Sequence, residues 1–432
     1  MTDVQKVKKT KRPLVPRLRF PEFKGKDDWQ APRLGDIAVP VEERAGDRNL
    51  TALSISAGAG FVPQSEKFGR NISGGQYRSY TVIHDGDFVY NKGNSIRFPQ
   101  GCVYDLQGWG EVAVPNVFIC FRLNGGCENK FFRQCFEKNI HGIQLRKYIT
   151  SSVRSNGLLN ISKRDFFSIR VPIPIRRERQ KIGECLSSLD DLISTEIRKL
   201  EVLKKYKRGF LAHIFPKDGH SVPRLRFPGF QNKNIWRRLS LDSVCEINPA
   251  KIVITGNPSV SFIPMSAISE EGRVIDSEVR RYSDVRKGYT CFIDRDVLIA
   301  KITPCFENGK AALVEGLVGG LGFGSTEFHV FRAYSDRCLP EFLFLQLYRD
   351  SVLEAGAISM VGNAGQRRVP VSFFEKLPFF LPVIDEQKVV VKFFRWIDSQ
   401  IASQRQKIDS LKVQKKGLLQ QLFPILNDEE FL

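Results

Sequence analysis

The sequence lacks the residue patterns on which metal sites and disulfide frameworks are built. Its five histidines are far apart, and none of its nine cysteines forms a Cys-x-x-Cys pair. A zinc site needs Cys and His ligands at short spacing, and a disulfide framework needs paired cysteines in an exported chain. The basic, polar N-terminus has no apolar signal segment behind it, and no run reaches the ~18 apolar residues of a membrane span. We therefore expect a reduced, cytoplasmic protein whose cysteines are mostly buried as small hydrophobic residues.

The motifs of several enzyme classes are missing as well. An adenine methyltransferase holds its flipped base in an Asn-Pro-Pro-aromatic loop, and the nearest match, at 248–251, lacks the second proline and the aromatic residue. A metal-dependent nuclease needs clustered carboxylates, and Asp296, Glu307 and Lys310 are only an incomplete approach to such a set. No P-loop lysine motif is present, and the glycine-rich run at 319–324 lacks the strand-loop-helix context of a cofactor loop. We interpret that run as a flexible turn before a strand at 327–331, and we expect no catalytic, cofactor-binding or metal-binding residue.

What the chain has in excess is positive charge. Lys and Arg total 66 against 47 Asp and Glu, which gives a net charge of +19. A protein this basic usually binds a polyanion, and of DNA, RNA and acidic membrane surfaces we favour nucleic acid. The 42% of hydrophobic residues is ordinary for a globular protein, and 432 residues are enough for about three domains with their own cores.

The chain also repeats itself. VPRLRFPEF at 15–23 recurs as VPRLRFPGF at 222–230, and residues 178–216 match residues 386–424. Between these matches the two halves diverge: VYNKGNSIRFPQG (89–101) and IAKITPCFENGK (299–310) share little beyond Lys92 and Lys301. The pattern predicts a common frame around two variable inserts, roughly 30–172 and 237–380, so that the frame does one job twice and the inserts do two versions of it.

Each half ends in a long segment with the period of an amphipathic helix. Apolar residues recur three and four positions apart, prolines precede and end each segment, and about 37 residues would give a rod of roughly 55 Å. We predict that the two helices pair as an antiparallel coiled coil with pseudo-twofold symmetry; the alternative is that each packs separately on its own domain. The polar interruptions Glu196 and Lys207 coincide with Gln404 and Lys415. The predicted seam consists of Leu186, Leu189, Ile193, Leu200, Leu203 and Phe210 with Phe394, Ile397, Ile401, Ile408, Leu411 and Leu418.

The inserts are predicted to be mixed α/β, with many short strands punctuated by Gly, Asn and Pro, and with a helix at 129–149 and at 339–355. Basic and amide side chains in their loops are suited to contact phosphates and base edges, since Arg and Lys donate to guanine and Asn pairs with adenine. The basic helix segments 198–208 and 405–416 are either solvated faces or contacts for DNA or an acidic partner. The candidate DNA-binding residues are Asn91, Lys92, Asn94, Arg97, Arg154, Asn156, Lys163 and Arg164 in the first insert and Lys301, Thr303, Asn308, Lys310, Asn363, Gln366, Arg367 and Arg368 in the second.

The doubled arrangement resembles the specificity subunits of type I restriction-modification enzymes. The matching features are the VPRLRFP-x-F arms, the P-x-x-x-E start of each long helix and its KKGLLQQLF-type end, over residues 13–424. One departure is IRRERQ at 175–180, where the second copy reads VIDEQ at 383–387. The organisation expected is α+β, with a basic tail (1–12), a first target recognition domain (13–175), a first spacer helix (176–216), a second recognition domain (217–383), a second spacer helix (384–424) and an acidic tail (425–432).

The resemblance implies a function without catalysis in this chain. Each recognition domain would read one half of a gapped double-stranded DNA site, and the helices would set the gap. Two copies of an adenine methyltransferase subunit would bring S-adenosylmethionine, and an ATP-dependent translocase-nuclease subunit would use ATP and Mg; no membrane partner is expected. Three alternatives stay open: a specificity chain for a fused methyltransferase-nuclease polypeptide, an autonomous DNA-modifying enzyme, and a coiled-coil scaffold with incidental charge.

Overall fold

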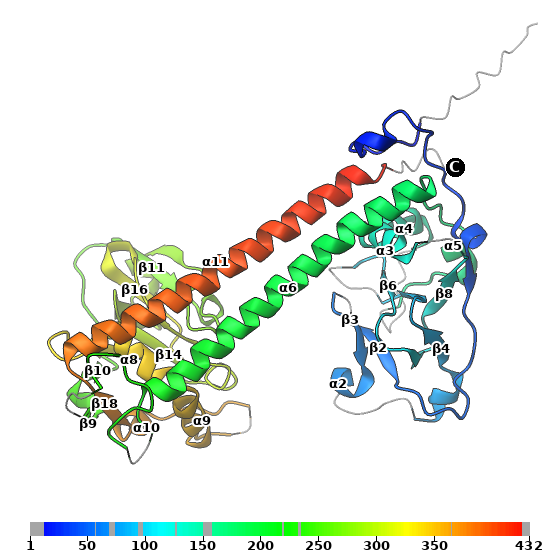
Figure 1. Ribbon diagram of the computed structural model, residues 1–432. Coiled ribbons are helices and arrows are strands. Elements are labelled where there is room, and N and C mark those ends of the chain that lie inside the picture. Colours follow the sequence, from blue (N-terminus) through cyan, green and yellow to red (C-terminus); the bar gives the residue numbers. More distant parts are fainter. Residues whose placement is uncertain are drawn as a thin grey trace, which may run out of the picture. The chain divides into compact units, whose positions relative to one another are not determined.

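The chain forms two compact units that share two long helices. The computed structural model describes residues 13–56, 58–68, 74–93, 98–125, 128–149, 158–217, 220–231, 235–363 and 365–425. The first unit comprises Met1–Glu196 and Lys407–Leu432, and the second comprises Ile197–Gln406. Helices α6 (Arg176–Ile214) and α11 (Ile384–Leu422), of 39 residues each, contribute a segment to both units (Figure 1). Among the described residues, no helix has the length and apolar character needed to cross a membrane.

The first unit is built on an antiparallel sheet with the strand order β1-β8-β5-β6. These strands are β1 (Ala38–Pro40), β8 (Ile119–Leu123), β5 (Phe88–Asn91) and β6 (Cys102–Asp105). Two further pairs are β2 (Leu53–Ser56) with β3 (Gly60–Pro63), and β4 (Thr81–His84) with β7 (Glu111–Val114). The short helices are η1 (Pro21–Phe23), α1 (Leu34–Ile37), α2 (Gln64–Phe68), η2 (Gly74–Ser79), α3 (Asn129–Glu137), α4 (Ile140–Leu145), η3 (Arg146–Tyr148) and α5 (Lys163–Phe167).

The second unit also has a four-stranded antiparallel sheet, and most of its other strands form a second four-stranded sheet. Its first sheet has the order β10-β17-β14-β15, its second has the order β12-β11-β16-β13, and β9 pairs with β18. The strands are β9 (Arg237–Ser240), β10 (Cys245–Ile247), β11 (Ser259–Ile263), β12 (Glu278–Arg281), β13 (Thr290–Ile293), β14 (Val297–Ala300), β15 (Ala311–Leu313), β16 (Leu321–Gly324), β17 (Phe328–Ala333) and β18 (Pro378–Leu381). The short helices are η4 (Leu241–Ser243), η5 (Met265–Ala267), α7 (Tyr282–Val285), η6 (Val318–Gly320), α8 (Pro340–Leu347), α9 (Asp350–Ile358) and α10 (Val371–Glu375).

The two inserts have more in common than their sequences indicate. The sheet β1-β8-β5-β6 has the same order and the same antiparallel pairing as β10-β17-β14-β15. In each sheet, a buried aspartate just before the third strand accepts two hydrogen bonds from an arginine on the neighbouring strand. The Nε–Oδ1 distances are 2.6 Å for Arg122 with Asp87 and 2.9 Å for Arg332 with Asp296. The common frame therefore includes this sheet. The two units differ in the loops and further strands that are attached to it.

Three predictions about the inserts were wrong. The helix expected at 129–149 is broken into α3, α4 and η3, with Asn139 in the left-handed region at φ 65° between the first two. The helix expected at 339–355 is likewise α8 followed by α9. The glycine-rich run expected to be a turn contains β16, a buried inner strand of the second sheet. A Cβ on Gly322 would lie 2.1 Å from the Phe292 ring, so glycine is there for close packing rather than for flexibility.

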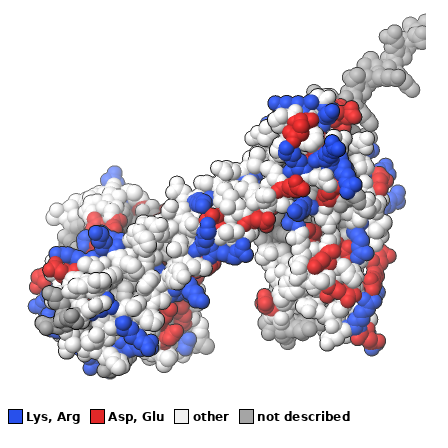
Figure 2. Space-filling view, viewed as in Figure 1, with Lys and Arg blue, Asp and Glu red and all other residues white. Residues whose placement is uncertain are grey.

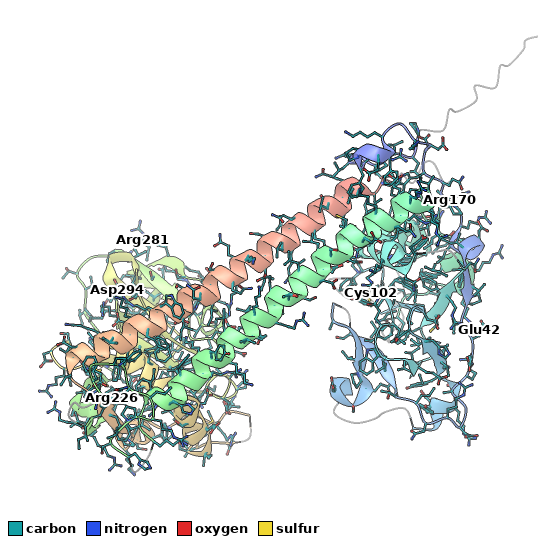
Figure 3. All side chains as sticks on the ribbon, in the orientation of Figure 1. Glu42, Cys102, Arg170, Arg226, Arg281 and Asp294 are labelled. Atoms are coloured by element: carbon teal, nitrogen blue, oxygen red, sulfur yellow. The ribbon has the colours of Figure 1, made fainter. Side chains whose placement is uncertain are left out.

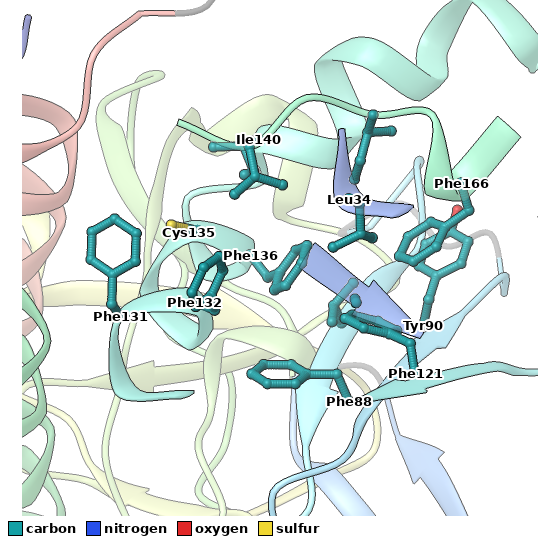
Figure 4. Packing of buried hydrophobic residues seen from close by; sticks show 14 of the residues in the cluster. Leu34, Phe88, Tyr90, Phe121, Phe131, Phe132, Cys135, Phe136, Ile140 and Phe166 are labelled. Atoms are coloured by element: carbon teal, nitrogen blue, oxygen red, sulfur yellow. The ribbon is translucent and has the colours of Figure 1, made fainter. Parts of the chain in front are cut away.

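Aromatic side chains fill the core of the first unit (Figure 4). Tyr90 stacks on Phe166 with ring centroids 4.5 Å apart. The same cluster includes Phe423, after the end of α11, whose ring meets Trp29 edge-on at 5.9 Å. In the second unit, the ring of Phe215 meets Trp236 in the same way, also at 5.9 Å. Each core is therefore completed by the end of the helix that begins in the other unit.

Within each unit the two long helices run antiparallel. In the first unit, Lys415 Nζ lies 2.6 Å from Asp190 Oδ1, and Lys407 Nζ lies 2.9 Å from Glu196 Oε1. Residue numbers thus rise on one helix as they fall on the other. In the second unit, Lys207 pairs with Asp398 at 2.8 Å and the ring of Phe210 with that of Phe393 at 5.0 Å. The predicted seam residues are buried (Leu186, Ile193, Leu200, Phe394, Ile397, Ile401, Ile408) or half-buried (Leu189, Leu203, Phe210, Leu411, Leu418).

A buried ion pair attaches each repeated arm to the start of a long helix. Arg19 donates from Nε and Nη2 to Glu178, both at 2.8 Å, and Arg226 donates from the same two nitrogens to Glu386, at 2.8 and 2.9 Å. The side chains of both glutamates are 1% exposed. The second of these two anchors lies at Arg226, which is labelled in Figure 3. Arm and helix are thus fixed to each other in each unit.

Candidate nucleic-acid interface

In the second unit, two loops that carry predicted DNA-binding residues meet. One loop follows β14 and the other precedes α10. Thr303 N donates to Arg367 O at 3.0 Å, and a β-bridge joins Ile302 to Arg368. The two loops therefore form one surface, although they are far apart in the sequence.

The corresponding loops meet in the first unit as well. Leu159 N donates to Lys92 O at 2.9 Å, and a β-bridge joins Gly93 to Leu158. Asn91 ends β5, and its Oδ1 accepts a hydrogen bond from Gly93 N at 2.8 Å, which fixes the first turn of the loop. Four further predicted residues lie outside the described part of the chain: Asn94, Arg97, Arg154 and Asn156.

The predicted arginines of the second unit have carboxylate partners. Arg368 donates from Nε and Nη2 to the two carboxylate oxygens of Glu327, both at 2.9 Å, and this lowers the pKa of Glu327. Arg367 Nη2 lies 3.6 Å from Glu307 Oε1. The two arginine side chains are 43% and 46% exposed, and exposed pairs of this kind contribute little to stability because solvent screens them. A DNA phosphate can therefore replace either carboxylate at little cost to the fold.

Three other predicted residues hold their loop together instead of facing solvent with free polar groups. The contacts are Thr303 Oγ1 with Glu307 Oε1 (3.0 Å), Asn308 Nδ2 with Glu270 Oε1 (2.8 Å) and Lys310 Nζ with the Met265 carbonyl (3.1 Å). Lys301 is half-buried, and Asn363 and Gln366 are exposed. Some polar side chains of this surface are thus hydrogen-bonded within the domain, and others are exposed to solvent.

In the first unit, Lys163 and Arg164 open helix α5. Lys163 Nζ pairs with Glu42, which is labelled in Figure 3. Arg164 is exposed and lines a pocket of ≈ 490 Å³ together with Arg33, Lys147 and Arg170. Sequence reasoning selected only Arg164 of these four. No local pattern connects the others, because the four residues come from three separate stretches of the chain.

The basic part of α6 is largely paired inside the second unit. Here a charged cavity of ≈ 440 Å³ lies beside α6 and α11. Glu271 bridges Lys204, at 3.2 Å, and Arg405. Lys207 pairs with Asp398 across the helices. These cations therefore stabilise the packing of the domain against the helices. On the visible faces, basic and acidic side chains are interspersed (Figure 2).

Within the described part of the chain, no group of three or more His, Cys, Asp or Glu side chains is placed to hold a metal ion. The carboxylate of Asp296 is held by Arg332 on the neighbouring strand. Two histidines are buried, and burial lowers the pKa of both, that of His141 to about 4. Burial also raises the pKa of the Cys120 thiol to about 12, as expected of a small hydrophobic residue in a core.

Comparison with known proteins gives one consistent result. The family described as "Type I restriction modification DNA specificity domain" matches residues 26–205 and again residues 234–413. The specificity subunits of the type I restriction enzymes EcoAI and EcoEI from Escherichia coli are 37% and 36% identical to 46% and 45% of this chain, which aligns with 34% and 33% of those relatives. The chain thus matches about a third of the length of these two proteins. The MjaVIII specificity subunit of Methanocaldococcus jannaschii is 22% identical over 93% of this chain and 92% of its own.

Two solved structures share the fold. One comes from a study of complex assembly and conformational transition of the type I R-M system, with a TM-score of 0.54, 17% identity and coverage of 93% of this chain and 97% of that one. The other is the type I restriction-modification system S subunit from M. genitalium, with a TM-score of 0.51, 13% identity and coverage of 96% and 100%.

Proposed function

Because the chain belongs to the type I restriction modification DNA specificity family, we propose that it is the sequence-reading subunit of a type I restriction-modification complex. Each unit reads one half of a bipartite, gapped site in double-stranded DNA. The family matches favour this reading over a specificity chain that serves a fused methyltransferase-nuclease polypeptide.

The observation that carries the proposal is one framework built twice under two different loop surfaces. The sheets β1-β8-β5-β6 and β10-β17-β14-β15, the arginines paired with a buried aspartate and the arm anchors match in the two units, whereas the sequences at 91–98 and 301–310 differ. A protein that reads two different half-sites needs a constant scaffold and variable readers, because base contacts specify while the scaffold positions. The net charge of +19 supplies the attraction for phosphates.

The chemistry belongs to partner subunits. Two adenine methyltransferase subunits bring S-adenosylmethionine, and an ATP-dependent translocase-nuclease subunit uses ATP and Mg for cleavage. This chain supplies the sequence recognition that places the methyltransferases over one adenine in each half-site.

The decisive experiment is modification mapping. The chain is expressed with its cognate methyltransferase subunit in a methylation-free host, and modified bases are located by sequencing. We expect one gapped motif with one methylated adenine per half. The same methyltransferase is also tested with another specificity chain. If it methylates DNA there but not with this chain, the proposed function is wrong and the scaffold hypothesis remains.

An exchange experiment tests the division into readers and frame. Replacing residues 30–172 by the insert of another family member should change one half of the motif and leave the other half unchanged. As the matched control, replacing residues 237–380 should change only the other half. A change in both halves after either exchange would contradict independent readers.

A third experiment tests the helices as a spacer. Inserting one heptad into both α6 and α11 keeps the seam in register and lengthens each helix by ~10 Å. We expect the gap in the motif to widen by about three base pairs, since one base pair of B-DNA rises ~3.4 Å. An unchanged gap in a complex that still methylates would refute the spacer role.

A further inference from the structure

The first unit contains a pocket whose lining is strongly cationic. It measures ≈ 490 Å³ and lies between the region of α4 and η3, the helix α5 and the residues that precede α1. Four of its lining side chains are basic: Arg33, Lys147, Arg164 and Arg170. Asp165 is its one acidic lining residue in the described part of the chain.

The charges of three of these side chains, Arg33, Lys147 and Arg164, are not neutralised by ion pairs among the described residues. The carboxylate of Asp165 accepts a hydrogen bond from Ser162 Oγ at 2.5 Å, as part of the N-terminal cap of α5. Among the described residues, no carboxylate lies within ion-pair distance of Arg33, Lys147 or Arg164, and all three are exposed. This differs from the exposed arginines of the second unit, which carry carboxylate partners.

Hydrogen bonds hold part of the pocket lining, Gln144 and Arg170, in place. Gln144 Nε2 donates to Arg170 O at 2.8 Å, and Gln144 Oε1 accepts from Arg170 N at 2.8 Å. Arg170, labelled in Figure 3, donates from Nη1 to Ala31 O at 2.9 Å, and a β-bridge joins it to Arg33. The backbone that carries two of the cations is therefore fixed before any ligand arrives, which reduces the entropy lost on binding.

We propose that this pocket binds a phosphate of the DNA backbone beside the half-site that the first unit reads. The inference rests on the proposed function and deepens it by naming a contact that gives affinity and register but no sequence preference. Guanidinium and ammonium groups are the donors that phosphates attract most strongly. Arg33, Lys147 and Arg164, against the single negative charge of Asp165, favour an anion.

The second unit also has a pocket of ≈ 490 Å³ beside Leu377 and Pro378, but its cations are different residues, Arg208, Lys217 and Arg349. The β-bridge between Arg33 and Arg170 corresponds to the pairing of Ser240 with Pro378. Arg164, the second residue of α5, corresponds to Ser372, the second residue of α10. Three cations of the first pocket are thus replaced by uncharged residues at the matching positions, so this particular set of cations belongs to the first unit alone.

The test uses the complex assembled with its methyltransferase subunits. In one variant Arg33, Lys147 and Arg164 are all replaced by Gln. The matched control replaces three exposed cations of the same unit outside the pocket, Arg17, Lys24 and Lys26, by Gln. Thermal unfolding of both variants establishes that they fold. Affinity for DNA with the mapped motif is then measured over a range of KCl concentrations.

We expect the pocket variant to lose affinity several-fold and the slope of log K against log salt to become shallower by about 0.9 for each phosphate contact removed, more than in the control. A scan with single methylphosphonate linkages should find a position flanking the first half-site that weakens the unaltered complex and has no effect on the pocket variant. Equal slopes in the two variants, or no such position, would overturn the inference.

Two further outcomes separate this inference from others. If inorganic phosphate or ATP binds the unaltered complex but not the pocket variant, while the DNA slope stays constant, the pocket takes a free anion and the assignment to DNA is wrong. If the unaltered complex shows no motif-dependent binding or methylation at all, the proposed function fails. A complex that reads its motif while the pocket variant behaves as the control refutes only the pocket.

Discussion

Replacing Arg19 by Met should destabilise the first unit strongly while leaving the second unit intact. Its guanidinium makes four hydrogen bonds, two with Glu178 at 2.8 Å and one each with the carbonyls of Lys26 (2.9 Å) and Asp27 (3.0 Å). Methionine fills part of the volume and donates to none of them. Glu178, with 1% of its side chain exposed, would be left as a buried carboxylate without its cation.

The magnitude follows from the desolvation of that carboxylate. Removing one partner of a buried ion pair destabilises by about 3–5 kcal/mol, whereas replacing both partners by apolar residues is often neutral. The corresponding change, Arg226→Met, should be milder by about 1–2 kcal/mol, because Glu386 also accepts a hydrogen bond from Trp236 Nε1 at 3.1 Å. Among the described residues, Trp29 Nε1 has no partner, so Glu178 has no such substitute.

Hydrogen exchange read by mass spectrometry measures the opening free energy of each unit separately. We expect Arg19→Met to lower it by about 3–5 kcal/mol in peptides of the first unit only, and Arg226→Met to act on the second unit only. The double variant Arg19→Met with Glu178→Met should recover most of the loss. A loss below ~1 kcal/mol in both single variants, or equal losses, would refute the reasoning from buried, unequally partnered carboxylates.

Three further outcomes are expected from the first unit. Gly183→Ala should destabilise it by about 1–3 kcal/mol in urea unfolding, despite the better helix propensity of Ala, because the new Cβ would lie 2.9 Å from the backbone nitrogen of Phe131. The buried His141 binds a proton less readily when folded, with a pKa of about 4, than when unfolded, at about 6.5; its contribution to stability, about 3 kcal/mol, is present above pH ~6.5 and is lost as the pH falls towards 4, and His141→Leu should flatten that pH profile. Lys415→Met should lower the melting temperature by leaving Asp190 and Glu137 without their shared cation, and adding Asp190→Asn, which removes one of the two unpaired charges, should recover part of the loss.

The long helices are the part of the fold that the sequence predicts best. Their apolar residues keep a helical period over many turns, and prolines mark both ends, so the predicted bounds are within two residues of α6 and α11. The coincidence of Lys207 with Lys415 in the repeat has a physical cause that the structure supplies. Both lysines pair across the helices, with Asp398 and with Asp190.

The inserts are predicted less well because tertiary contacts decide their local structure. Gly322 is in a strand because the Phe292 ring lies against it, and Asn139 breaks a helix by adopting a left-handed conformation that many residues tolerate poorly. The four cations of the first unit's pocket also meet only through the fold. Periodicity and turn signals in a sequence do not indicate which distant parts of the chain come into contact.

The departure between the two helix starts shows how the frame is conserved without identical residues. Gln387 accepts a hydrogen bond from Leu339 N, just before α8, at 2.9 Å, and donates to Pro382 O at 3.1 Å. At the matching place, Arg179 donates to Glu128, just before α3, at 2.8 Å and to Pro174 O at 3.1 Å. The long helix is thus joined to the start of the domain helix by an ion pair in one unit and by an amide hydrogen bond in the other. A comparison of the sequences shows only that Arg179 and Gln387 differ.

These contacts explain why one scaffold can support two different readers. The groups that fix the frame, such as Glu178, Glu386 and Asp296, are buried with paired charges, so each substitution there removes several kcal/mol. The loop cations Arg367 and Arg368 are exposed, and their ion pairs contribute little to stability. Loop residues can therefore change at little cost in stability, whereas changes in the frame that positions them are costly.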